Sequence, residues 1–154
     1  MFSGNGEIVN FNKSYRTTAE IMESADDVLD SIGLSRSDMV VRHGNPVQVS
    51  EIEDANNIPE YIAEKICEYK EKGYKTIAVI SKTDLLSNYI NKALKMFGIN
   101  IPNVTANDDL IDEKFRVCTI SNQLAKGLEF DAVILNNANE EIYSSNSSLD
   151  MKLL

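Results

Sequence analysis

Three short apolar runs constrain the fold of this chain most. Residues 76–80 read TIAVI, residues 116–121 read RVCTIS and residues 132–135 read AVIL. Continuous apolar runs of this length, rich in β-branched residues, are typical of strands that are buried on both faces of a parallel sheet. Helical patterns lie before and between the runs, so the sequence predicts an α/β fold.

The expected helices have recognisable ends. A threonine at 17 or 18 can cap a helix that reaches about residue 31. A second helix follows Asn57, which we predict as its cap, with Pro59 in the first turn. Thr83 caps a third helix, which we expect to run to about Phe97 and to stop at Gly98. We also predict short strands at residues 7–11, 46–49 and 103–106.

This order of elements predicts a mainly parallel sheet that is flanked by helices and covered on both faces, with right-handed crossovers. In such sheets, ligands bind beyond the carboxyl ends of the strands. The side chains that follow the predicted strands are therefore the first candidates for a functional site.

Composition narrows the classes of function. The chain has 154 residues and a net charge of −9, which argues against a domain that binds nucleic acid alone through a broad basic face. Two cysteines, Cys67 and Cys118, lie too far apart in sequence for a metal motif and are expected to be reduced thiols. No apolar run approaches a membrane span, and no signal peptide is evident. We expect a cytoplasmic protein without a membrane or metal site.

Two segments carry more specific information. Residues 125–135 read AKGLEFDAVIL, and residues 12–18 read NKSYRTT. The first resembles motif V and the second resembles motif IV of superfamily-one helicases. The resemblance implies a three-layer RecA-like (P-loop NTPase-type) domain of the UvrD C-terminal type, which is the second motor domain of a DNA-binding, ATP-hydrolysing helicase. It further implies that ATP with Mg²⁺ is bound mainly by the first RecA-like domain of the same polypeptide.

Arg16 is the strongest single candidate. An arginine offers a fixed fork of donors that fits phosphate oxygens and keeps its charge. By the resemblance, Arg16 is catalytic and reaches the γ-phosphate of ATP, while Tyr15 stacks on the adenine. The alternative is a surface arginine that pairs with Glu20 or Glu23 on the following helix.

Motif V supplies the other candidates. By the resemblance, Gly127 and Glu129 lie at the nucleotide, with the Glu129 carboxylate at the ribose hydroxyls. Thr119, Ser121 and Lys126 are the candidates for contact with the DNA backbone, since hydroxyl groups and lysines are common phosphate partners. The alternative is a plain turn in which Gly127 serves only a positive φ.

The motif departs from the commonest UvrD-like pattern. Residues 119–127 are two residues longer than T-x-H-x-x-K-G and lack its histidine, a form similar to the HelD or helicase IV-like branch. The chain has no phosphate loop of its own. It also ends where the resemblance places motif VI, so we expect residues 1–154 to be one second motor domain, cut from a longer protein and inactive in isolation.

Two alternatives stay open. One is that the chain resembles the HelD-like proteins of Gram-positive bacteria, which act on RNA polymerase and use ATP to release stalled polymerase; the acidic charge suits a protein partner. The other alternative is a non-catalytic α/β adaptor that has kept the fold. His43, the only histidine, has no second ligand nearby in sequence and is expected on a surface loop.

Overall fold

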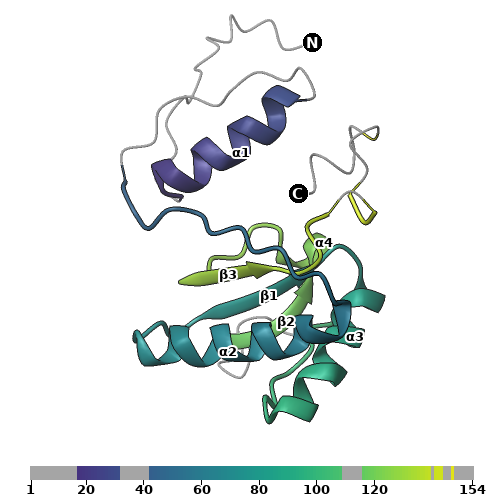
Figure 1. The fold of residues 1–154 in the computed structure, drawn as a ribbon. Coiled ribbons are helices and arrows are strands. Elements are labelled where there is room, and N and C mark those ends of the chain that lie inside the picture. Colours follow the sequence, from purple (N-terminus) through teal and green to yellow (C-terminus); the bar gives the residue numbers. More distant parts are fainter. Residues whose placement is uncertain (1–16, 32–41, 109–115, 140, 144–146, 148–154) are drawn as a thin grey trace, which may run out of the picture. The chain divides into compact units, whose positions relative to one another are not determined.

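The computed structural model describes residues 17–31, 42–108, 116–139, 141–143 and 147 (Figure 1). The chain divides into two compact units. The first unit contains Met1–Val49 with most of the C-terminal residues, and the second contains Ser50–Ser144. The strand predicted at residues 7–11 lies outside the described residues. The prediction that residues 1–154 form one domain stays a prediction.

The second unit is built on a three-stranded parallel sheet. Its strands are β1 (Ile77–Ser81), β2 (Val117–Ser121) and β3 (Ala132–Leu135), in the order β2-β1-β3. Ile77 pairs with Val117 on one side and with Ala132 on the other. All three apolar runs are therefore strands, and the predicted α/β fold with a mainly parallel sheet is confirmed.

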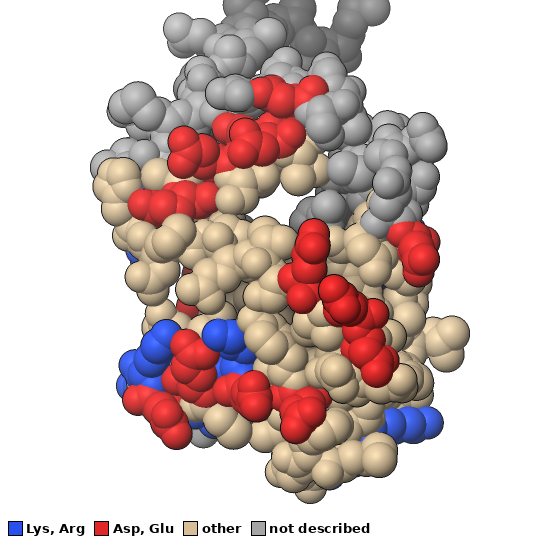
Figure 2. Space-filling view, in the orientation of Figure 1, with Lys and Arg blue, Asp and Glu red and all other residues tan. Residues whose placement is uncertain are grey.

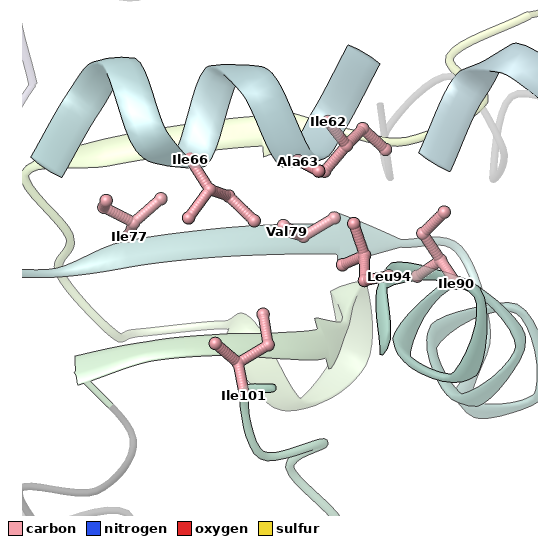
Figure 3. Packing of buried hydrophobic residues seen from close by; sticks show 8 residues of the cluster. All are labelled: Ile62, Ala63, Ile66, Ile77, Val79, Ile90, Leu94 and Ile101. Atoms are coloured by element: carbon pink, nitrogen blue, oxygen red, sulfur yellow. The ribbon is translucent and has the colours of Figure 1, made fainter. Parts of the chain in front are cut away.

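Two helices, α2 (Ile58–Glu71) and α3 (Asp84–Leu94), cover one face of this sheet. Figure 3 shows their aliphatic side chains meeting those of β1. Ile66, Ile77 and Leu94 are completely buried. Branched aliphatic side chains at helical spacing on α2 and α3, set against alternate residues of β1, fill this layer at the density of a protein core.

A second core lies on the opposite face. It consists of Ala78, Ile80, Val104, Cys118 and Ile120, packed against Leu124, Ala125, Leu128 and Phe130. These last four side chains come from the connector, which we define as residues 122–131 between β2 and β3. The connector opens with the short helix α4 (Asn122–Ala125) and continues without regular structure to β3.

The helix ends follow local chemistry. Thr83 caps α3, and its hydroxyl accepts a hydrogen bond from the Leu86 amide at 3.3 Å. The α-helix ends earlier than predicted, because its last turn tightens into the 3-10 helix η2 (Lys95–Phe97) before Gly98, whose φ is 76°. Asn57 makes no side-chain cap. Asp54 instead caps the 3-10 helix η1 (Ala55–Asn57), which leads into α2.

Two predicted strands are absent. Residues 46–49 contain no strand, and the Val49 side chain is 89% exposed, so its alternation with Val47 buries no apolar face. Residues 103–106 form only an isolated bridge between Asn103 and Thr119. Alternating or apolar residues indicate a strand only where a neighbouring strand offers a free edge.

In the first unit, α1 (Ala19–Ser31) begins where predicted, with the Thr18 hydroxyl accepting from the Ile21 amide at 3.4 Å. The Glu20 carboxylate accepts from the Gly44 amide at 2.8 Å and lies 3.0 Å from the His43 ring. Backbone N–H groups of Glu20 itself and Gly44, together with His43, lower the pKa of Glu20 to about 2. His43 is exposed, as predicted, and this contact ties residues 42–44 to the first turn of α1.

Candidate functional site at the carboxyl edge of the sheet

Polar side chains line the carboxyl edge across all three strands. Ser81 and Ser121 are register partners at the ends of β1 and β2, and Asn136 follows β3. The Asn136 amide nitrogen donates to the Ser81 hydroxyl at 3.2 Å. Ser121 Oγ and Asn136 Oδ1 are buried and make no hydrogen bond within the described part of the chain. A buried polar row at this edge is where an α/β sheet receives its ligands.

Thr119 lies further inside the sheet. Its hydroxyl accepts from the Asn91 amide nitrogen at 3.0 Å and donates to Asn103 Oδ1 at 2.8 Å. Asn91 also donates to the Ile101 carbonyl at 2.9 Å, and Ser87 donates to Asn103. The Thr119 side chain is fully buried, so this network joins α3 to β2. The DNA contacts predicted for Thr119 and Ser121 stay predictions; both hydroxyls lie inside the unit in this structure.

Lys126 and Gly127 form the exposed turn of the connector. They follow α4, which lies beside the arrowheads of the strands in Figure 1. Gly127 has a φ of 86°, a left-handed conformation that favours glycine, and the Leu128 amide donates to the Ala125 carbonyl at 3.0 Å across the turn. This positive φ is the feature that the alternative of a plain turn requires, and the predicted nucleotide contact of Gly127 stays a prediction. Lys126 therefore stands on the surface close to the carboxyl edge.

Glu129 lies on the outer side of the connector. Leu128 and Phe130 on either side of it pack into the second core, whereas the Glu129 side chain is exposed. Alternation of this kind in an extended segment points successive side chains to opposite sides. An exposed carboxylate there has the acceptor chemistry that ribose hydroxyls need. Its predicted nucleotide contact stays a prediction.

Asp131, the last residue of the connector, is hydrogen-bonded to the residues that precede β1. Its carboxylate accepts from the Thr76 amide at 2.9 Å and from the Lys75 amide at 2.8 Å, and its own amide donates to the Thr76 hydroxyl at 2.8 Å. These bonds, first from Thr76 and then from Lys75, hold the pKa of Asp131 below its usual range. The connector is thus pinned at the amino edge of the sheet, beside the start of β1.

Sequence reasoning missed part of this edge. Lys82, directly after β1, donates to the Ile142 carbonyl at 2.6 Å and lies 5.3 Å from the centre of the buried Tyr143 ring. The place of Ser81 and Lys82 in the sequence could have identified them. Both residues follow a predicted buried strand, just as Arg16 and Lys126 follow other predicted strands. Tyr15 and Arg16 themselves lie outside the described residues, and so does any contact between motif IV and this edge.

Charge on the described surface is mainly negative. Figure 2 shows carboxylates spread over one face, with blue side chains confined to a few places. On α2, Glu68 lies 2.7 Å from Lys65 and 2.6 Å from Lys72, and the two lysines lower its pKa to about 2. No group of histidine, cysteine and acidic side chains in the described ranges could hold a metal ion. No described helix combines the length and hydropathy that crossing a membrane requires.

Comparison with known proteins assigns the family. No curated protein matches the chain. The fold is similar to the crystal structure of the C-terminal domain of a possible DNA helicase from Lactobacillus plantarum WCFS1, with a TM-score of 0.72 and 25% sequence identity over 91% of this chain and 77% of that one. The three-layer RecA-like arrangement predicted for the chain agrees with this likeness. The family model of the UvrD-like helicase C-terminal domain matches residues 9–111, which include Tyr15 and Arg16, and the chain therefore belongs to the UvrD-like helicase C-terminal domain family.

Proposed function

We propose that this chain is the second motor domain of an ATP-driven superfamily-one DNA helicase or translocase. The observation that carries the proposal is the family match over residues 9–111, which contain the Tyr15-Arg16 pair. The Lys126-Gly127 turn beside the carboxyl edge supports it independently, because it lies beyond the matched residues. The partner is the first RecA-like domain of the same polypeptide, which brings the phosphate loop.

The nucleotide side of the proposal uses Arg16, Tyr15, Gly127 and Glu129. ATP with Mg²⁺, bound mainly by the first domain, supplies the phosphoanhydride whose hydrolysis drives the motor. Arg16 places a permanent positive charge against the γ-phosphate, and Tyr15 stacks on the base. Glu129, exposed on the outer side of the connector, accepts from the ribose hydroxyls.

The DNA side begins with Lys126. Its exposed ammonium, held beside Gly127, is free to meet a backbone phosphate without disturbing the core. Thr119 and Ser121 belong to β2, the strand that precedes the connector. Because both side chains are buried, their predicted DNA contacts require the carboxyl edge of the sheet to open. Because few cationic groups contribute against a net charge of −9, binding by this chain alone should be weak and its salt slope shallow.

Single substitutions in the full-length parent protein test the proposal. Arg16→Ala should lower ATP turnover about a thousandfold with DNA binding retained, because the lost charge acts mainly in the transition state. Lys126→Ala should instead weaken DNA binding. It should also reduce, by about one, the magnitude of the slope of the logarithm of the binding constant against the logarithm of salt concentration. Lys70→Ala, an exposed lysine in the last turn of α2, is the matched control. Normal turnover in Arg16→Ala would return this residue to a surface ion pair.

The longer motif V favours one branch of the family. We propose that the chain is HelD-like, since residues 119–127 have the longer form of the motif and residues 124–134 read L-A-K-G-L-E-F-D-A-V-I. In that branch the motor acts on RNA polymerase, and the acidic surface is compatible with a protein partner (Figure 2). Co-purification of the full-length parent with purified RNA polymerase core, compared with its Arg16→Ala variant in the presence of ATP, tests this. A parent that binds only DNA is a plain helicase.

A further inference from the structure

Helix α3 carries a second apolar stripe that the fold does not use. Leu85 and Tyr89 lie four residues apart, and Met96 continues the line in the 3-10 turn η2. Their exposed fractions are 78%, 69% and 85%. Single exposed apolar residues are ordinary, but three of this size on one side of α3 and of the turn that continues it are the kind of feature that marks an interaction surface.

The stripe lies opposite the buried side of α3. The buried side consists of Ser87, Ile90, Asn91 and Leu94, which face the sheet and α2. At 100° per residue, Leu85 and Tyr89 lie on the other side of the helix axis. A helix that is apolar on two opposite sides has one side for its own core and one for a neighbour.

Two lysines accompany the stripe. Lys92 falls between Tyr89 and Met96 at helical spacing, and Lys95 follows in η2. Both are exposed, and neither forms a salt bridge with a described residue. On a chain with a net charge of −9, this is a local cationic site with no acidic partner of its own. The Lys92 stem also extends the apolar stripe toward Met96.

We propose that the outer face of α3 and η2 docks an acidic amphipathic helix of a partner protein. A ridge of side chains at i and i+4 on a convex helix packs into the groove of another helix. The two lysines select carboxylates beside the apolar contacts of that helix at the Met96 end of the stripe, whereas Asp84 lies at the other end, in the first turn of α3. Tyr89 is the only aromatic side chain among the three residues of the stripe, so it offers one base a stacking face, whereas successive bases would need several; this favours a protein over single-stranded nucleic acid.

This surface does not depend on the proposed motor function. The test uses the 154-residue chain and two synthetic helical peptides. One peptide has leucines at i, i+4 and i+7 flanked by glutamates, and the other has lysines in place of the glutamates. We expect the acidic peptide to bind, and Leu85→Ser with Tyr89→Ser to weaken it at least tenfold. Lys92→Glu with Lys95→Glu should weaken the acidic peptide about tenfold and make the lysine peptide the better ligand.

Val49→Ser, at an apolar residue that is 89% exposed elsewhere, and Lys70→Glu on α2 are matched controls that should leave binding unchanged. Thermal melts of each variant establish that the fold is kept. The proposal is overturned if neither peptide binds, or if the charge reversal does not exchange the preference. It is also overturned if the Leu85 and Tyr89 substitutions instead abolish oligonucleotide binding, or abolish concentration-dependent dimers in light scattering.

Discussion

The two faces of the sheet are built differently. On one face, Ile77 and Val79 of β1 meet α2 and α3, and the layer is closed by large aliphatic side chains (Figure 3). On the other, Ala78 and Cys118 are small, and the connector crosses them with four partly buried side chains. On β3 this second face is open, since Val133 and Leu135 are 46% and 43% exposed.

The helix-covered face stabilises the sheet, whereas the other face carries the residues of the proposed site. The helix-covered face fixes the strands by burial, which is the largest favourable contribution to folding. On the face that the connector covers, the connector itself lies at the surface. Lys126, Gly127 and Glu129 are therefore exposed and can reach a ligand.

Thiol labelling should show the largest effect. Burial under the connector raises the pKa of Cys118 to about 11, whereas Cys67 is exposed on α2. The raised pKa alone reduces the reactive thiolate at pH 8 by roughly a hundredfold, and burial slows access further. Cys118 should therefore react with a thiol reagent at least a hundredfold more slowly than Cys67. Mass spectrometry of a labelling time course, with a urea-unfolded sample as control, reads both sites; equal rates would mean that the connector does not close this face.

Core truncations should differ between the faces. Ile66→Ala, in a completely buried side chain of α2, should lower the free energy of unfolding by about 3 kcal/mol, through lost transfer energy and the cavity left behind. Leu128→Ala in the connector removes a similar volume from a half-buried position and should cost about 1–2 kcal/mol. Urea unfolding of both variants measures the two values. A larger loss for Leu128→Ala would make the connector the main support of the sheet.

Gly127→Ala should cost about 1–2 kcal/mol of stability, because an alanine at a φ of 86° is strained while its Cβ meets no atom within 4 Å. Gly73→Ala is a closely matched control, because Gly73 also has a φ of 86° and a Cβ there would also meet no atom within 4 Å. The two variants should therefore lose similar stability. Only Gly127→Ala should also reduce DNA-stimulated ATP turnover of the full-length parent, and equal turnover in both would leave Gly127 as a plain turn.

The elements that bury an apolar run could be predicted from sequence. All three strands of the sheet, α2 and the Thr83 cap of α3 follow from local pattern. The strand order β2-β1-β3 could not, because it depends on which strands meet after the chain has folded. The false strand at residues 46–49 has the same cause: Val47 and Val49 alternate correctly but find no partner.

The sequence predicted which residues belong to the candidate site better than it predicted which of them are exposed and which are buried. Lys126 and Gly127 stand on the surface, as a turn between strands should. Thr119 is different, because its burial depends on Asn91 of α3 and Asn103 of the following loop, far away in sequence. The available signal was that two polar residues, Ser87 and Asn91, fall on the buried stripe of α3, where a polar side chain needs an internal partner.

The smallest effect should be a pH-dependent one at Asp131. Asp131→Asn removes the charge that accepts from the Thr76 and Lys75 amides at an exposed position, so we expect a loss of about 1 kcal/mol at pH 7. Because folding lowers the pKa of this carboxyl group, its stabilising contribution is complete above the unfolded pKa. That contribution disappears as the pH falls through the folded pKa.

The difference in unfolding free energy between wild type and Asp131→Asn should therefore shrink once the pH falls below the unfolded pKa of the carboxyl group, and it should continue to shrink as the pH falls through the lowered folded pKa. Glu64→Gln on α2, where the carboxylate makes no hydrogen bond within the described residues, should show little difference at either pH. Urea unfolding at several pH values measures both. A difference for Asp131→Asn that stays constant with pH would assign its effect to packing of the β3 entrance, and the connector would then be held by Thr76 alone.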